Sequence, residues 1–344
     1  MKNIFVKPAL LTLVSFAVFV SCVTASAPPQ WAATGNGVQL AYPRSVYIAQ
    51  KGEGGTRKDA EMAATVELSR YFTREVTDKV SRKRLSGTQN GVDYESTTRD
   101  TDTLIKSETN LIAVRLSQPY NANKNEWAVV AYIDREEAWE IYLPRVEKAA
   151  GVFSALHEAA EKESDDLKKY FAYMACAAYS DSVEFLTITL FAQTLYPAKA
   201  EATYRVVNAQ IEELPQKIIA ARQKNQIFIN CPADSDGIIT TAFSKSFNAE
   251  GFTVITNRAA TSALCEVLVD EGVRQTDTGT FYYPTVTAVL SGKTGALWTY
   301  NANATRQGAV TPDVAKRRAY TALAQEIEKS FSSAFNNVFK NKDK

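Results

Sequence analysis

The sequence predicts an α+β protein in which two α/β-sandwich-like domains, each a helix on a mixed sheet, are separated by a helical hairpin or bundle. Three patterns support this fold class: a strand, glycine turn and helix before residue 80, an Ala-, Glu-, Lys- and Leu-rich stretch over 135–224, and strands followed by a long helix after 225. With 344 residues, the chain has room for two or three domains. We expect 1–22 to be a lipoprotein signal, 23–40 a linker, 41–143 the first α+β domain, 144–224 the helical segment and 225–344 the second α+β domain.

The first hydrophobic run of the chain is too short to cross a membrane. Lys2 and Lys7 give it a basic start, and residues 8–20 are almost all apolar. That is about a dozen residues, whereas a membrane-spanning helix needs roughly 20. The run therefore predicts a secretory signal.

Cys22 lies directly after this run, preceded by Ser21 and followed by the small, polar "VTASAPPQ". The arrangement resembles a bacterial lipobox, with Phe19 where leucine is usual. The resemblance implies that Cys22 is diacylated and becomes the first residue, so that the lipid bilayer is a partner. Val23, rather than Asp, favours the periplasmic face of the outer membrane by resemblance to sorted lipoproteins. The alternative is an ordinary cleaved signal in which Cys22 is incidental.

The prolines and glycines of 23–40 indicate a linker. A short strand, a glycine turn and a helix follow, with Thr56 as the expected N-cap. The helix has an apolar residue at every fourth position: Ala60, Ala64, Leu68, Phe72 and Val76. From Val80 to about Ser117, alternation predicts a long polar strand region, and residues 126–134 predict an apolar strand.

Residues 135–224 predict helices, with Pro144, Pro197 and Pro215 as breaks. After them we expect the order βαβ(α)βββα, with a helix ending at Gly251 and a final helix over 312–340. The final helix carries a stripe with a spacing of four: Ala315, Ala319, Leu323, Ile327, Phe331, Phe335 and Phe339. Such a stripe favours packing on a sheet.

The four cysteines and the single histidine offer little chemistry. His157 has no second metal ligand near it in sequence, so we expect a helix-surface residue and no metal site. Apart from Cys22 three cysteines remain, so at least one is free. We expect Cys176 in the core. Cys231 and Cys265 should lie at opposite ends of parallel strands and form no bridge.

Three short motifs resemble ligand sites but fit structural roles better. "SGKTG" at 291–295 lacks the first glycine and the following helix of a P-loop, so we expect a hairpin turn. "KGEGGT" at 51–56 predicts a tight strand-to-helix turn rather than a dinucleotide site. In "DSDG" at 234–237, Ser235 or Asp236 should cap a helix rather than bind calcium. The pair at 165–166 should be a solvated helix face.

No catalytic residue and no cofactor are therefore expected, and the protein is not expected to be an enzyme. Thirty-nine basic residues against 38 acidic ones give a net charge of +1, which argues against a nucleic-acid partner. We therefore expect the protein to act through contacts with other molecules.

Two family resemblances bear on what those contacts are. Residues 40–143, with "YPRSVYIAQKGEGGTRKDAEMAATVELSRYF" and "EWAVVAYIDREEAWEIY", resemble the small outer-membrane lipoprotein domain that also forms the N-terminal part of flagellar assembly protein T. Residues 225–340, with "AFSKSFNAEGFTVIT", "PTVTAVLSGKTGALWTY" and "AKRRAYTALAQEIEKSF", resemble the domain shared by the N-terminal part of TolB, CsgG and LpoB.

The resemblances cover about two thirds of the chain and imply a function in binding other envelope proteins. The first hypothesis is a periplasmic lipoprotein that helps to assemble an envelope machine of flagellar or secretion type. The alternative is a regulator of a peptidoglycan synthase. The partner is then an unidentified envelope protein, and a homo-oligomer is a further option.

Overall fold

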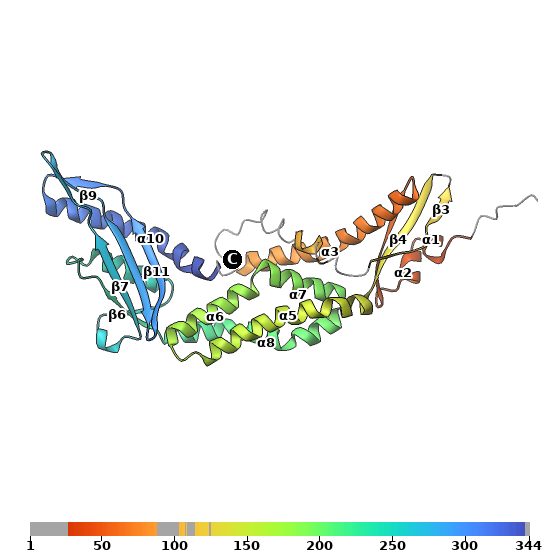
Figure 1. The fold of residues 1–344 in the computed structure, drawn as a ribbon, viewed down its shortest axis with the longest axis horizontal. Helices are drawn as coiled ribbons and strands as arrows, with labels where there is room; N and C mark the ends of the chain where they lie inside the picture. The colour runs from red at the N-terminus through yellow and green to blue at the C-terminus, as the bar shows by residue number, and fades with distance from the viewer. Residues whose placement is uncertain (1–26, 88–102, 107, 109–113, 124, 341–344) are drawn as a thin grey trace, which may run out of the picture.

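The computed structural model describes residues 27–87, 103–106, 108, 114–123 and 125–340. Cys22 lies outside these residues. Figure 1 shows an elongated molecule with one sheet near each end and four helices, α5 to α8, between them. Helices and sheets thus occupy separate parts of the chain, which confirms the α+β fold class.

The first sheet is antiparallel and centres on β4, which pairs with β1, β2 and β3. Its buried face packs on the long helix α3, whose stripe of every fourth residue, Ala60 to Val76, is fully buried. Thr56 caps α3, since its Oγ1 accepts a hydrogen bond of 3.2 Å from the N–H of Asp59. The bounds are β1 Tyr47–Gly54, α3 Arg57–Gly87, β2 Arg115–Leu116, β3 Tyr120–Asn123 and β4 Glu126–Asp134.

Two predictions for this region are wrong. The linker predicted over 23–40 gives way at residue 30 to the short helices α1, Gln30–Ala33, and α2, Gly37–Ala41. They pack on the outer face of the sheet because Trp31 is buried there against Ala128 and Val130. The polar strand predicted from Val80 is also wrong at its start, since α3 continues to residue 87, and residues 103–106 are helical. Much of the remaining prediction falls outside the described residues.

The helical segment is a bundle rather than a hairpin: α6 and α7 follow each other end to end and together lie alongside α5 and α8 (Figure 1). Its helices are α5 Arg135–Lys162, α6 Asp166–Ser180, α7 Val183–Leu195 and α8 Pro197–Gln223. Of the three predicted breaks only Pro197 is one, at the start of α8, where its missing N–H costs nothing. Pro144 and Pro215 lie inside α5 and α8, because the apolar stripes of these long helices outweigh one lost hydrogen bond each.

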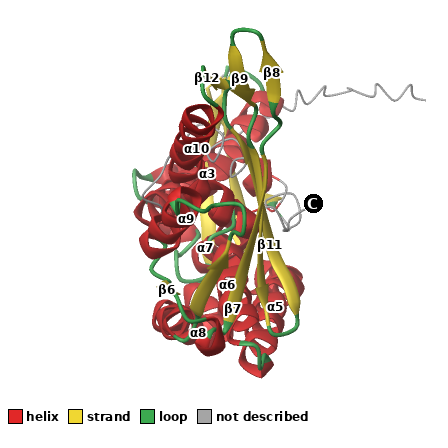
Figure 2. Ribbon diagram, turned by 90° about the vertical axis from the view of Figure 1, so that its left-hand side faces the viewer, coloured by secondary structure: helices red, strands yellow, loops and turns green. Residues whose placement is uncertain are grey.

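The second large sheet is mixed, with the strand order β11-β10-β7-β5-β6. The helices α9 and α10 lie together on one face, to the left of the strands in Figure 2. The stripe of α10 is buried from Ala315 to Phe335, as predicted, while the side chain of Phe339 is not described. The bounds are β5 Gln226–Asn230, α9 Ile238–Ala249, β6 Thr253–Ile255, β7 Ala263–Asp270, β10 Thr285–Gly292, β11 Gly295–Asn303 and α10 Pro312–Lys340.

A separate small sheet, not predicted, lies at the far tip of this part (Figures 1 and 2). Its order is β12-β9-β8, and it packs on the first turns of α10. The stretches 263–276 and 279–292 each supply one strand to the mixed sheet and one to the small sheet. The chain therefore has more strands here than the predicted order βαβ(α)βββα. The bounds are β8 Arg274–Thr276, β9 Gly279–Tyr282 and β12 Gln307–Ala309, and a short 3-10 helix, Arg258–Ala260, follows β6.

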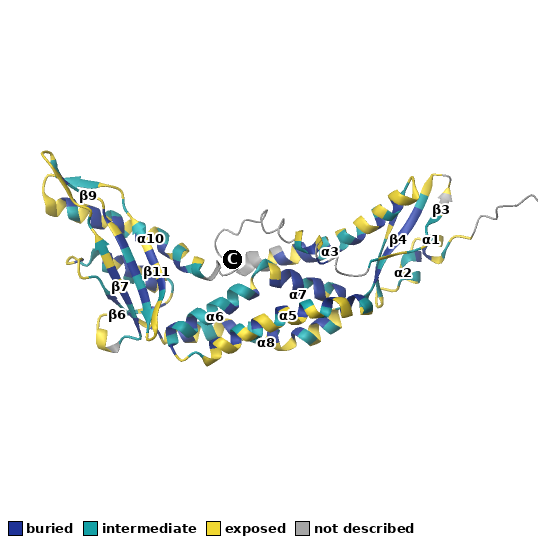
Figure 3. Cartoon of the chain, in the orientation of Figure 1, coloured by how far each residue is buried: buried dark blue, intermediate teal, exposed yellow. Residues whose placement is uncertain are grey.

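One contiguous cluster of buried apolar residues runs through both large sheets and the bundle (Figure 3). Aromatic pairs join its parts: Phe72 of α3 stacks on Phe191 of α7 at 4.6 Å, and Tyr170 of α6 meets Phe252 at 5.0 Å. No helix in the described part of the chain is long and apolar enough to cross a membrane.

The described cysteines, Cys176, Cys231 and Cys265, are all free. The predicted placement of the last two at opposite ends of the sheet is wrong. Ile229 pairs with Cys265, so Cys231, two residues further on, lies near the same position of the sheet and not at its opposite end. Cys176 is fully buried on α6, as expected of a core residue.

Candidate functional site

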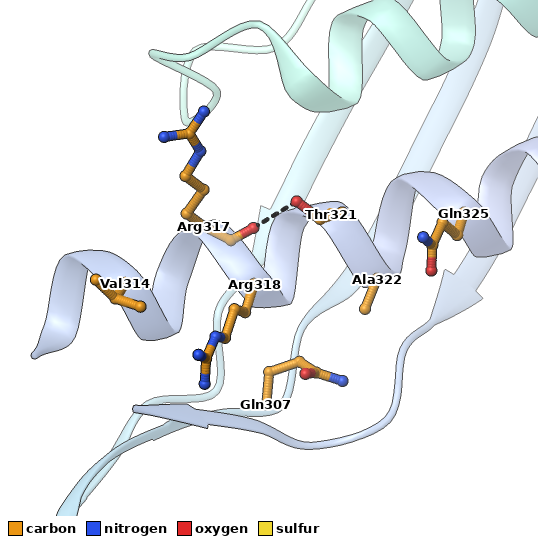
Figure 4. A pocket seen from close by; sticks show the side chains of 7 residues that line it. All are labelled: Gln307, Val314, Arg317, Arg318, Thr321, Ala322 and Gln325. Carbon is orange, nitrogen blue, oxygen red and sulfur yellow. Dashed lines mark hydrogen bonds between the residues drawn. The ribbon is translucent and has the colours of Figure 1, made fainter. Parts of the chain in front are cut away.

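A hollow of the described surface lies at the far tip, between α10 and β12. It has a volume of about 540 Å³ and is lined by Gln307, Val314, Arg317, Arg318, Thr321, Ala322 and Gln325. Figure 4 shows these side chains: Arg318 and Ala322 extend from α10 toward Gln307 of β12, whereas Arg317 extends from the other side of the helix. We call this hollow the tip groove.

One hydrogen bond joins the two walls of the tip groove, and two others each lie within a single wall. Arg318 donates to the carbonyl of Gly308 at 3.1 Å, which ties α10 to β12. On the strand side, Gln307 Nε2 donates to the carbonyl of Thr305 at 3.2 Å. Thr321 donates to the carbonyl of Arg317 one turn earlier, at 2.8 Å, as the dashed line in Figure 4 shows. The bond between Arg318 and Gly308 thus sets the spacing of the two walls.

The charge of the tip groove is positive, because two arginines line it and no acidic residue does. Arg317 makes no ion pair with any described residue. The neighbouring Lys316 pairs with Glu271. Nearby, the Arg306 guanidinium lies 4.7 Å from the ring centroid of Phe281. Guanidinium groups bind carboxylates through two parallel hydrogen bonds, so the groove suits an acidic side chain or a chain terminus.

A second, smaller hollow of about 260 Å³ lies on the other side of Arg317 and is lined by Ser235, Asp236, Ile238, Asp313, Lys316, Arg317 and Tyr320. Here Lys316 is already paired. Glu271 Oε1 accepts from Lys316 at 2.7 Å and from Tyr320 at 2.8 Å. Burial alone would raise the pKa of Glu271, but these bonds outweigh it and lower the pKa. Lys316 of this hollow thus has an acidic partner, whereas Arg317 and Arg318 form no ion pair with the described residues.

The prediction that His157 lies on the helix surface is wrong, because the residue is buried in the bundle at 6% exposure. Its ring stacks near Phe153, with 6.2 Å between ring centroids. Lys217 Nζ, from α8, donates to Nε2 at 3.1 Å, which leaves the imidazole proton on Nδ1. Burial and then the charge of Lys217 lower the pKa of His157, so the ring is neutral at pH 7.

The "SGKTG" motif forms the turn of the β10–β11 hairpin, where Gly292 pairs with Gly295, as predicted. This turn contacts the bundle. Asp165 Oδ2 accepts hydrogen bonds from the N–H of Thr294 at 3.1 Å and from its hydroxyl at 3.2 Å. Asp165 is buried at 2% exposure, so the solvated face predicted for 165–166 is wrong at this residue.

The other two motifs also have structural roles. Gly52 lies in β1, and a Cβ there would stand 2.0 Å from the backbone nitrogen of Ala64, so the glycine permits close contact between strand and helix. In "DSDG" the cap comes from Asp234 rather than Ser235 or Asp236. Its two carboxylate oxygens accept from the N–H of Ile238 at 2.9 Å and of Thr240 at 2.7 Å.

Within the described ranges, no group of three or more His, Cys, Asp or Glu side chains lies close enough to hold a metal ion. The residues of the tip groove were not singled out from the sequence. The signal was the basic run at 316–318, "KRR", but a charge run gives no direction until the helix face and the opposing strand are known.

No protein-family model and no curated protein sequence matches the chain. Among solved structures, a minor lipoprotein from Acinetobacter baumannii is similar at 15% identity and a TM-score of 0.24, covering 32% of this chain and 94% of that one. Lipoprotein GNA1162 from Neisseria meningitidis is similar at 12% identity and a TM-score of 0.21, covering 33% and 97%. The secreted protein HP1454 from Helicobacter pylori is similar at 13% identity and a TM-score of 0.30, covering 87% and 99%. The neighbours are thus bacterial lipoproteins and a secreted protein, at scores too low for any conclusion about this chain.

Proposed function

We propose that the protein is a lipid-anchored protein of the periplasmic face of the outer membrane that presents its tip groove to an acidic segment of another envelope protein. It acts by contact and not by catalysis, in the assembly of an envelope machine of flagellar or secretion type. The observation that carries the proposal is the position of the groove at the end of the molecule opposite to α1, the element nearest to Cys22 in sequence (Figure 1).

The dimensions support this arrangement. Only seven residues lie between Cys22 and Gln30, so the eight steps along the chain span at most about 26 Å at about 3.3 Å per residue. An acylated Cys22 would therefore hold the first sheet near the bilayer. The 28 residues of α5 add about 42 Å at about 1.5 Å per residue, so the groove stands well away from the anchor. This reach also keeps a regulator of a peptidoglycan synthase as the second candidate, because it compensates for a short linker.

Anchoring and contact are tested separately. Cys22→Ser should move the full chain from the membrane fraction to the soluble periplasmic fraction, because one diacyl group supplies the stable anchor. Retention of the variant in the membrane fraction would contradict the lipid anchor.

For the groove, a photo-reactive residue at Val314, which is 47% exposed, should cross-link one partner in cells. Arg317→Glu should abolish that product, because it opposes an acidic ligand. Lys329→Glu is the matched control, since it lies on the same helix outside the groove, is 80% exposed and carries the same charge change. An equal yield in both variants would exclude an acidic partner at the groove.

A further inference from the structure

The mixed sheet ends in a long strand, β11, whose outer edge has no partner among the described strands. β11 is the last strand in the order β11-β10-β7-β5-β6, and its main neighbours among the described elements are β10 on one edge and α10 on one face. The strand reads "GALWTYNAN" over nine residues, with no charge and no proline. Native proteins usually protect such an edge with lysine, proline or a covering segment, because it can template pairing with another strand.

The hydrogen-bonding register identifies which backbone groups point away from β10. The N–H of Ala304 donates to the carbonyl of Pro284 at 3.1 Å, so this pair is of the hydrogen-bonded kind. Such pairs alternate along an antiparallel ladder. In the regular part of the register, where Thr285 pairs with Asn303 and Val289 with Thr299, the outward-directed residues of β11 are therefore Thr299, Asn301 and Asn303.

These three residues are exposed, and they are symmetric about Asn301. The opposite face of the strand is already fixed. Trp298 and Tyr300 are buried beneath α10, and the Tyr300 hydroxyl lies 2.8 Å from Ser330 Oγ. The edge is thus a rigid, preformed row of donors and acceptors on a strand that the rest of the domain holds in place.

We propose that β11 pairs with β11 of a second copy of this chain, antiparallel and about a two-fold axis at Asn301, to form one continuous sheet across two molecules. In this register Asn301 faces its own counterpart, and Thr299 faces Asn303 of the other copy. Each of the three pairs exchanges two backbone hydrogen bonds. A second copy fits because the strand has no charge: like charges meeting across a two-fold axis would oppose self-pairing, and here there are none.

The test is disulfide cross-linking of the full chain in cells. Asn301→Cys places two thiols on opposed residues whose Cα atoms are about 5.5 Å apart in a hydrogen-bonded pair, which is within the range for a disulfide. We expect a disulfide-linked dimer on a non-reducing gel. The matched control is Thr285→Cys, which is exposed but lies one strand further in, on β10, between β11 and β7. Its copies would be roughly 15 Å apart across the sheet, from 5.5 Å plus two strand spacings of about 4.8 Å, and about 13 Å apart along the strands, because Thr285 pairs with Asn303, two residues from the axis. The total of about 20 Å is too long for a cross-link.

Register is tested with two further variants that keep the native backbone. Chains with Thr299→Cys and chains with Asn303→Cys should cross-link to each other when produced together, and far less to themselves. Asn301→Lys should reduce the Thr299–Asn303 product at least tenfold. Equal cross-linking of Thr285→Cys and Asn301→Cys, a monomer only, or a product between Asn301→Cys and a different protein would each overturn the proposal. The native cysteines are the same in every variant.

Discussion

Replacing Asp165 by Ala should weaken the junction between the bundle and the mixed sheet. The carboxylate does two tasks at once. Its Oδ1 caps α6 by accepting from the N–H of Leu167 at 3.0 Å and of Lys168 at 3.2 Å, and its Oδ2 holds the Thr294 turn. Loss of a cap costs about 1 kcal/mol. Hydrogen bonds to a charged group contribute about 1.5–3 kcal/mol each, but Thr294 is exposed and water can replace its partner, so we count about 1–2 kcal/mol for both.

We therefore expect Asp165→Ala to lower the free energy of unfolding by about 2–3 kcal/mol in urea denaturation of the full chain at pH 7. The neighbouring Asp166→Ala is the matched control. Asp166 lies in the first turn of α6, where an acidic side chain favours the helix dipole by only about 0.3–1 kcal/mol. If the two variants lose stability equally, the carboxylate of Asp165 does not hold the junction.

The pH dependence gives a second check on the same residue. Burial alone would raise the pKa of Asp165, but hydrogen bonds from the backbone of Lys168, Thr294 and Leu167 outweigh it and lower the pKa. A lowered pKa in the folded state means that the stabilisation is present above the unfolded value of 3.8 and is lost as the pH falls through the folded value. Asp165→Asn should therefore lose less stability than the native chain between pH 5 and pH 2, by about 1 kcal/mol or more for each unit of lowered pKa.

Two further predictions concern single positions with sharp controls. The only imidazole of the chain, His157, should titrate below its ordinary pKa of 6.5 in NMR. Lys217→Met should raise that pKa, because it removes a cation that opposes protonation. An unchanged pKa in this variant would contradict the contact between Lys217 and His157. Because the pKa is lowered in the folded state, the native chain should lose stability as the pH falls below about 6.5. Gly52→Ala should destabilise the chain by about 3 kcal/mol or more through the 2.0 Å clash with Ala64. Gly55→Ala, with nothing within 4 Å of the added Cβ, should change the free energy of unfolding by under about 1 kcal/mol. Similar melting temperatures of both variants would exclude the clash.

Local patterns with one strong period were predictable from the sequence. The stripe of α3 and the strand over 126–134 were found because burial on one face imposes a spacing of four on a helix and a buried core favours an apolar strand. Features that depend on distant partners were not. Trp31 defines α1 only through its contact with Ala128 and Val130, and β12 exists as a strand because it pairs with β9. The acidic side chain of Asp165 led to the prediction that this residue is exposed to solvent. Its hydrogen-bond partner, Thr294, is 129 residues away, so no pattern in the sequence indicated the contact.

The same long-range contacts explain how the ends of the molecule keep their relation to each other. A chain of helices joined by short turns would bend if each joint were held by surface charge alone, because exposed ion pairs contribute little. Here the joint between bundle and mixed sheet combines the Asp165–Thr294 bonds with aromatic packing, since Phe171 of α6 meets Phe335 of α10 at 5.8 Å. Directional bonds fix the angle and buried rings resist separation. The tip groove and the edge of β11 lie in different sheets, but α10 packs on both β12 and β11, so pairing of two copies through β11 would present two grooves in one fixed orientation to a partner.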